Sequence, residues 1–175
     1  FEAMGAKIAP DAATALKDAD IVLKVRPPSP EEIGFMKRGA ILAALLSPAT
    51  EKETIAKLAE AGINAFAMEF LPRISRAQAM DVLSSQANLA GYKAVVDAAA
   101  AFGRAMPMMM TAAGTIAPAR VLVMGAGVAG LQAIATARRL GAIVSATDVR
   151  PATKEQVESL GATFVAVMDE EFAQA

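Results

Sequence analysis

The chain has 175 residues, 55% of them hydrophobic, which is ample for a packed core and excludes a disordered protein. Its 17 basic and 18 acidic side chains give a formal net charge of -1, so no basic excess is available for binding nucleic acid or an anionic membrane surface. The absence of Cys and His excludes a disulfide framework, a thiolate nucleophile, an imidazole base and a Cys/His zinc site.

Helix and strand signals alternate through the first 68 residues, which predicts an α/β fold. Strands are predicted near 6–9, 20–26, 40–46 and 63–68, and helices near 11–18, 30–37 and 51–61. The run 41–46 is apolar at every position, which favours a parallel sheet with helices on both faces. Capping boxes are predicted to begin helices at Ser29, Thr50 and Thr153, and the glycines at 62, 141 and 161 are expected to be left-handed at helix ends.

A long helix is predicted from just after Ser75, which forms a capping box with Gln78, to about Arg104. Pro107 stops it, and its length is typical of a connection between two domains. We therefore expect a first α/β subdomain over 1–75, a bridging helix and linker over 76–118, and a second subdomain over 119–175. The methionines at 106, 108, 109 and 110 are interpreted as core or interface residues.

No membrane-spanning segment is predicted, although the mean hydropathy is +0.41. The longest uncharged run, 121–137, has 17 residues and contains three glycines. A spanning helix needs about 20 consecutive apolar residues, so this run is too short and too glycine-rich.

The clearest motif follows a strand predicted over 121–124. Gly125-Ala126-Gly127-Val128-Ala129-Gly130 then leads into a helix that ends near residue 140, which is the G-x-G-x-x-G pattern of dinucleotide-binding folds. The first glycine makes a tight turn, the second lets the backbone approach a pyrophosphate, and the third allows close helix packing. N–H groups at the helix N-terminus bind the phosphates without basic side chains. A glycine turn without a ligand is the alternative, and this context disfavours it.

A second strand, predicted over 143–147, ends at Asp148, 18 residues after Gly130. That spacing is typical of a carboxylate that accepts hydrogen bonds from the adenosine ribose and repels a 2′-phosphate, which favours NAD over NADP. Arg150 leaves NADP open, because an arginine beside the ribose can bind that phosphate.

A polar cluster lies at the predicted start of the bridging helix. Gln78, Asp81 and Ser84 or Ser85 would share one face of a helix beginning at Ser75, with Arg73 in the loop before it. The residue types alone favour a structural interpretation, in which Gln78 completes a cap and Asp81 interacts with the helix dipole or with Arg73. A ligand site is the alternative.

Essentially the whole chain resembles domain I of proton-translocating NAD(P) transhydrogenase, in the alanine dehydrogenase/transhydrogenase family. The resemblance is carried by the segments 22–28, 73–92, 107–115, 125–137 and 147–150. It implies two α/β subdomains joined by a long helix, the second of them Rossmann-like, with NAD(H) in the cleft between them. It also implies direct hydride exchange with NADP(H) on a partner domain III, and proton translocation through a membrane domain II.

The resemblance further implies the roles of individual residues. Arg73, Gln78 and Asp81 would position the nicotinamide without acid or base chemistry, with Ser84 close by, so that the ligand interpretation replaces the capping one for Gln78. The rest of the cofactor would be held by Gly125, Gly127, Val128, Ala129, Gly130, Asp148, Val149 and Arg150. The family also implies a homodimer that is active only with its partner domains. Its place would be the cytoplasmic side of a bacterial inner membrane, or the matrix side in mitochondria.

An alanine dehydrogenase and a non-catalytic NAD-binding module are the two alternatives to a transhydrogenase component. Alanine dehydrogenase shares the architecture, but its catalytic Lys and His would fall at Arg26 and Ser47, which cannot take over those roles. A non-catalytic NAD-binding module would not need Arg73, Gln78 and Asp81 together.

Only three strands are predicted after residue 120, near 121–124, 143–147 and 163–167. A complete dinucleotide fold has about six. We therefore expect the chain to be an internal portion of the domain that lacks the second half of the nucleotide site.

Overall fold

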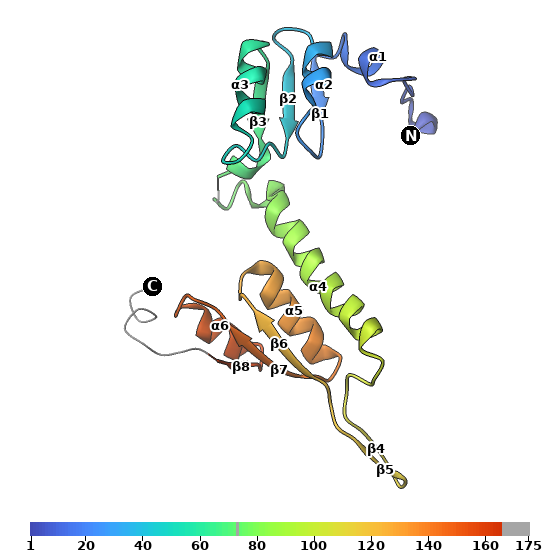
Figure 1. Cartoon of the computed structure of the whole chain (residues 1–175), viewed down its shortest axis with the longest axis vertical. Coiled ribbons are helices and arrows are strands. Elements are labelled where there is room, and N and C mark those ends of the chain that lie inside the picture. Colours follow the sequence, from blue (N-terminus) through green and yellow to red (C-terminus); the bar gives the residue numbers. More distant parts are fainter. Residues whose placement is uncertain (73, 166–175) are drawn as a thin grey trace. The chain divides into compact units, whose positions relative to one another are not determined.

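The computed structural model describes residues 1–72 and 74–165 (Figure 1). The chain divides into two compact units, one ending at Val82 and the other beginning at Leu83, and each has its own hydrophobic core. Both units contain a three-stranded parallel sheet whose strands alternate with helices, which confirms the predicted α/β class. No helix within the described ranges combines the length and hydrophobicity needed to cross a bilayer.

The first unit is built around the parallel sheet β1-β2-β3. Leu42, Leu46 and Leu58 are fully buried at the centre of its core. On the opposite face of the sheet Ile21, Leu23 and Phe66 are exposed in the described chain, so the prediction that helices cover both faces is wrong for these residues. The elements of this unit, in order, are η1 (Glu2–Met4), α1 (Ala12–Leu16), β1 (Ile21–Leu23), α2 (Pro30–Phe35), β2 (Ile41–Ala44), α3 (Lys52–Glu60), β3 (Asn64–Ala67), η2 (Met68–Phe70) and η3 (Gln78–Met80).

The second unit contains a parallel sheet of order β6-β7-β8 and a separate antiparallel hairpin, β4-β5. Side chains from α4, α5 and α6 pack with the inward-facing strand residues, and Ile134, Val144 and Val157 are among the most buried. Leu122 and Met124 are exposed on the other face. The elements, in order, are α4 (Val82–Phe102), β4 (Met109–Thr111), β5 (Gly114–Ile116), β6 (Arg120–Met124), α5 (Val128–Arg139), β7 (Ile143–Thr147), α6 (Thr153–Ser159) and β8 (Thr163–Phe164).

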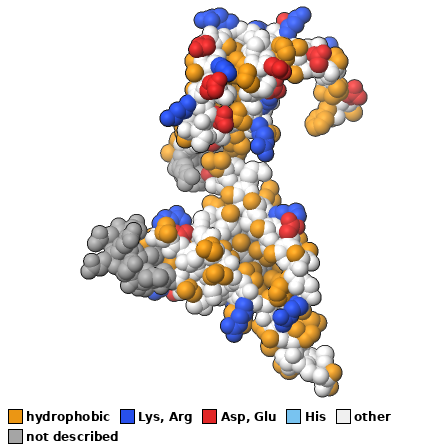
Figure 2. Space-filling view, in the orientation of Figure 1, with side chains coloured by type: hydrophobic (Ala, Val, Ile, Leu, Met, Phe, Trp, Pro, Cys, Tyr) orange, Lys and Arg blue, Asp and Glu red, His pale blue; other side chains and the backbone are white. Residues whose placement is uncertain are grey.

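The hairpin β4-β5 is not among the elements that the sequence predicts. Its strands pair from Met109 opposite Ile116 to Thr111 opposite Gly114, and it extends away from the sheet of its own unit (Figure 1). Met108, Met109 and Met110 are exposed, and hydrophobic side chains are visible on this surface in Figure 2. These three methionines are therefore not core residues in the described chain.

One of the four predicted capping boxes is present. The Ser29 hydroxyl oxygen accepts a hydrogen bond from the Glu32 N–H at 3.2 Å, and the Glu32 carboxylate accepts one from the Ser29 N–H at 2.7 Å. The boxes at Thr50 and Thr153 are wrong, because the N-caps of α3 and α6 are Glu51 and Ala152, and neither makes a side-chain cap hydrogen bond. The two threonine hydroxyls donate to the carbonyl oxygens three residues earlier, of Ser47 and Arg150 respectively. The left-handed glycines at helix ends are confirmed, with φ of 70° at Gly62, 86° at Gly141 and 77° at Gly161.

Two predicted element positions are also wrong. Residues 6–9 form no strand, and no other described strand pairs with them. The long helix begins at Val82 rather than after Ser75, because Asp81 has a non-helical ψ of 87° that separates the short turn η3 from α4. No side-chain cap forms at the start of η3, so the predicted capping box between Ser75 and Gln78 is absent.

Candidate dinucleotide-binding site

The glycine-rich loop connects β6 to α5 in the second unit. Gly125 has a φ of 96°, in the left-handed region that favours glycine, and its N–H donates to the Thr147 carbonyl at 2.8 Å. Gly127 is the N-cap of α5 and carries no side chain that could cover the first turn. The N–H groups of that turn and the positive end of the dipole of this 12-residue helix are thus open to an anion.

The glycines at 127 and 130 face different surroundings. A Cβ at position 130 would lie 1.8 Å from the Gly125 carbonyl oxygen, so the close approach of helix and loop requires a glycine there. A Cβ at position 127 would meet no atom within 4 Å, so the chain itself does not need a glycine at that position. Open space beside a bare backbone is what a bound pyrophosphate uses, and the loop therefore fits a dinucleotide.

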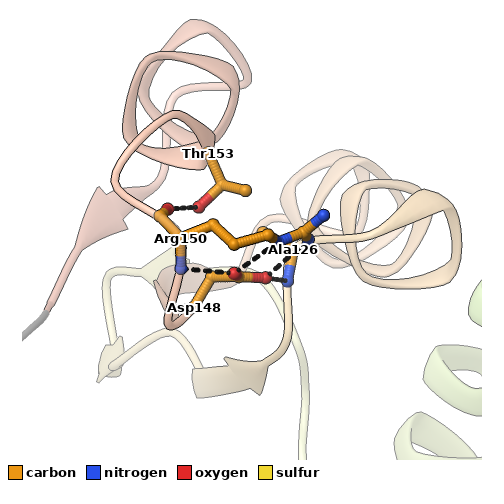
Figure 3. Close-up of polar contacts among 4 residues, drawn as sticks. All are labelled: Ala126, Asp148, Arg150 and Thr153. Atoms are coloured by element: carbon orange, nitrogen blue, oxygen red, sulfur yellow. Dashed lines mark hydrogen bonds and ion pairs between the residues drawn. The ribbon is translucent and has the colours of Figure 1, made fainter. Parts of the chain in front are cut away.

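Asp148 follows β7 and lies beside this loop (Figure 3). Its side chain is only 6% exposed. Oδ2 accepts a hydrogen bond from the Ala126 N–H at 2.7 Å, and Oδ1 accepts one from the Arg150 N–H at 2.9 Å. The carboxylate therefore ties the end of β7 to the second residue of the glycine loop.

Asp148 is also paired with the side chain of Arg150. Arg150 Nε donates to Oδ1 at 2.9 Å and its terminal Nη2 donates to Oδ2 at 3.0 Å, in a two-pronged contact. These bonds, together with the two backbone N–H groups, hold the pKa of Asp148 well below its usual range although burial opposes the shift, and the carboxylate raises the pKa of Arg150. Asp148 is therefore ionised at neutral pH.

Of the other residues predicted for this half of the site, Val128 at the start of α5 and Val149 after Asp148 are both exposed. Ala129 and Gly130 lie in the first turn of α5. The structure thus brings the glycine loop, Asp148 and Arg150 together in one unit. An anion at the helix N-terminus is the ligand group that this surface fits.

The second predicted cluster is not assembled on one helix. Arg73 lies outside the described residues. Gln78 is exposed in η3, Asp81 lies between η3 and α4, and Ser84 lies in the first turn of α4. The prediction that Gln78, Asp81 and Ser84 share a helix face is therefore wrong, because the helix on which it depended begins after Asp81.

One acidic residue that the sequence patterns do not single out, Glu69, lies at the carboxyl end of the first sheet. Its carboxylate accepts hydrogen bonds from the N–H groups of Leu46 at 3.1 Å and Ser47 at 2.6 Å, in the loop after β2. Burial alone would raise the pKa of Glu69, but the backbone donors outweigh it and lower the pKa. Ser47 has a φ of 48°, which is unusual for a residue other than glycine. The sequence feature that could have identified Glu69 is its place as an acidic residue just after the parallel strand β3.

A parallel α/β unit with a glycine loop that opens a helix, and an acidic residue ending the next strand, is characteristic of dinucleotide-binding proteins. The family model described as the alanine dehydrogenase/PNT N-terminal domain matches residues 1–90, and that of the C-terminal domain matches residues 94–175. The chain therefore belongs to the alanine dehydrogenase/PNT family.

Individual relatives agree with this assignment. The chain is 60% identical to an NAD(P) transhydrogenase subunit alpha protein of Rhodospirillum rubrum over 96% of its own length and 45% of that protein. It matches the crystal structure of transhydrogenase from Sinorhizobium meliloti at a TM-score of 0.86 and 63% identity, covering 95% of this chain and 49% of that one. Alanine dehydrogenase of Halomonas elongata is 32% identical over 85% of this chain and 40% of the relative. The chain thus spans about half the length of these two transhydrogenase relatives.

Proposed function

We propose that the chain is part of the NAD(H)-binding component of a proton-translocating transhydrogenase. The observation that carries this proposal is the ionised Asp148 tied to the glycine loop, in a chain far more similar to transhydrogenase subunits than to alanine dehydrogenases. NAD(H) supplies hydride chemistry at its nicotinamide when bound. The glycine loop would hold the pyrophosphate, and Asp148, Val149 and Arg150 would hold the adenosine half.

Arg73, Gln78 and Asp81, with Ser84, are proposed to position the nicotinamide and to exclude water from it. Direct hydride transfer between two nicotinamides moves no proton at the reacting carbons, so it needs orientation and proximity rather than a general base. A chain without histidine is compatible with that reaction. Substituting Gln78 or Asp81 is expected to lower turnover more than it weakens NADH binding, because small misplacements of reacting groups are costly.

The proposed assembly contains this component as a homodimer, an NADP(H)-binding domain III and a membrane domain II that couples hydride transfer to proton translocation. The component would lie on the cytoplasmic side of a bacterial inner membrane, or on the matrix side in mitochondria. It would be active only together with those partners. The exposed methionines of the β4-β5 hairpin supply an apolar surface that is compatible with a dimer contact.

Amino-acid dehydrogenase activity is the second candidate, because alanine dehydrogenases are relatives of the chain. Arg26 and Ser47 argue against it, since an arginine stays charged and a serine is no base at neutral pH. The test is hydride transfer from NADPH to an NAD analogue by the full-length protein mixed with an NADP-binding domain III, with alanine plus NAD assayed in parallel. Transfer between nucleotides without alanine oxidation is expected. Alanine oxidation, or NADH binding without either reaction, would contradict the proposed function.

A further inference from the structure

The Asp148 carboxylate has no acceptor position left over. A carboxylate offers about four lone-pair sites, two on each oxygen. Oδ1 accepts from the N–H and Nε of Arg150, and Oδ2 accepts from the Ala126 N–H and Nη2 of Arg150. A ribose hydroxyl could donate to this carboxylate only after one of these four donors has left.

Two of the four donors are held in place by the backbone. The Ala126 N–H belongs to the glycine loop, and Ala126 is almost completely buried. The Arg150 N–H belongs to a turn in which the Arg150 carbonyl accepts a hydrogen bond from the Thr153 hydroxyl at 2.7 Å (Figure 3). The same carbonyl accepts a second one from the Thr153 N–H at 3.1 Å. Displacing either one would require the loop or the turn to rearrange.

The other two donors belong to one partly exposed side chain. The Arg150 side chain is 56% exposed, and among the described residues its guanidinium bonds only to Asp148. Its rotation into solvent would free one acceptor position on each oxygen. The carboxylate would stay oriented, because both backbone donors remain.

We propose that the Arg150 guanidinium competes with the adenosine ribose for Asp148, and that NAD(H) binding displaces it. This inference rests on the proposed NAD(H) site and makes Arg150 a residue that sets NADH affinity rather than a simple contact residue. The two vacated positions match the two donors of a ribose with free 2′- and 3′-hydroxyls. A ribose 2′-phosphate has no hydroxyl to offer at one of them and would face the ionised carboxylate, so Asp148 disfavours NADP(H).

The test is NADH binding to the full-length protein, followed by nucleotide fluorescence at fixed ionic strength, for wild type, Arg150→Gln, Arg150→Lys and Arg139→Gln. Arg150→Gln should tighten NADH binding by about two- to fivefold, the range expected when a partly exposed ion pair no longer has to be broken. Arg150→Lys keeps the charge but loses the two-pronged contact and should lie between. Arg139→Gln removes an exposed arginine at the other end of α5 and should leave the affinity unchanged.

A second ligand separates competition from a structural effect. The gain in Arg150→Gln should shrink for an NAD analogue that lacks the 2′-hydroxyl of its adenosine ribose, whereas a general loosening of the turn would affect both ligands equally. Unchanged or weaker NADH binding by Arg150→Gln, while wild type binds NADH, would overturn the competition and leave the proposed function intact. Failure of wild type to bind NADH would overturn both.

Discussion

Gly91 in the middle of α4 lies directly against the backbone of Ala129 in the first turn of α5. A Cβ at position 91 would stand 2.0 Å from the Ala129 carbonyl oxygen and 2.8 Å from its carbonyl carbon. These distances are far below van der Waals contact, so the two helices approach as closely as they do only because residue 91 has no side chain. The helix that presents the glycine loop is therefore positioned by a backbone contact with α4.

Gly91→Ala is expected to destabilise the protein by about 1–3 kcal/mol, as overpacked sites do. The sign of this change in stability distinguishes a close helix contact from an open site, because replacing a glycine inside a helix by alanine normally stabilises a protein by about 0.5–1 kcal/mol. Gly34→Ala in α2 is the matched control, since a Cβ there would meet nothing within 4 Å. Urea denaturation measures both free energies of unfolding. A stabilised Gly91→Ala would show that α4 and α5 do not pack this closely.

Substitutions of two loop glycines, Gly130 and Gly127, should affect stability and NADH binding differently. Gly130→Ala places a Cβ 1.8 Å from the Gly125 carbonyl oxygen and should lower the midpoint of thermal unfolding by several degrees. Gly127→Ala places its Cβ in open space, so it should leave that midpoint within about a degree and weaken NADH binding, because the pyrophosphate needs that space. Thermal unfolding and NADH titration of the two variants check this split. NADH binding by Gly127→Ala equal to wild type would place the pyrophosphate elsewhere.

The depressed pKa of Asp148 gives its contribution to stability a defined pH dependence. Its pKa is lower in the folded than in the unfolded protein, so the contribution is fully present above the unfolded pKa of about 3.9 and is lost as the pH falls through the folded pKa. The difference in free energy of unfolding between wild type and Asp148→Asn should be constant from about pH 5 to pH 8 and shrink below about pH 4. A difference that already changed across the neutral range would contradict the assigned hydrogen bonds.

Substitutions of Glu69 and Ser47 are expected to change the stability of the first unit in opposite directions. Glu69→Gln retains only one oxygen for the Leu46 and Ser47 N–H groups and should destabilise the protein by about 1–3 kcal/mol, the cost of leaving a donor unsatisfied. Ser47→Gly should be neutral or slightly stabilising, because glycine adopts the φ of 48° without strain. Chemical denaturation of both variants measures the signs. A strongly destabilised Ser47→Gly would mean that the serine side chain has a role of its own.

The parts of the fold that could be predicted are those with local causes. The Ser29 capping box and the glycines at 62, 141 and 161 have hydrogen bonding and backbone conformations fixed by a few neighbouring residues, and the structure has them where predicted. Residues 6–9 resemble a strand locally, but a strand also needs a partner, and no described strand supplies one.

The candidate site was predictable to a similar extent. The glycine spacing and the distance to Asp148 identified the loop and the carboxylate, because both lie on consecutive elements of one motif. The pairing of Arg150 with Asp148, and of Glu69 with the loop at Ser47, depends on the directions of side chains that sequence spacing does not encode. The start of α4 also differs from the prediction. Ser75 is a residue type that often caps helices, but the chain makes the separate turn η3 before α4 begins.

The most direct test of the account is an NADH fluorescence titration of wild type, Asp148→Ala and Asp97→Ala in the full-length protein. Asp97 is an exposed carboxylate of α4 that pairs with Lys93, so its removal takes away the same charge at a distance from the loop. We predict that wild type and Asp97→Ala bind NADH alike, and that Asp148→Ala loses at least about tenfold in affinity with the charge-assisted hydrogen bonds to the ribose. Unchanged NADH affinity in Asp148→Ala would contradict the assignment of the adenosine site.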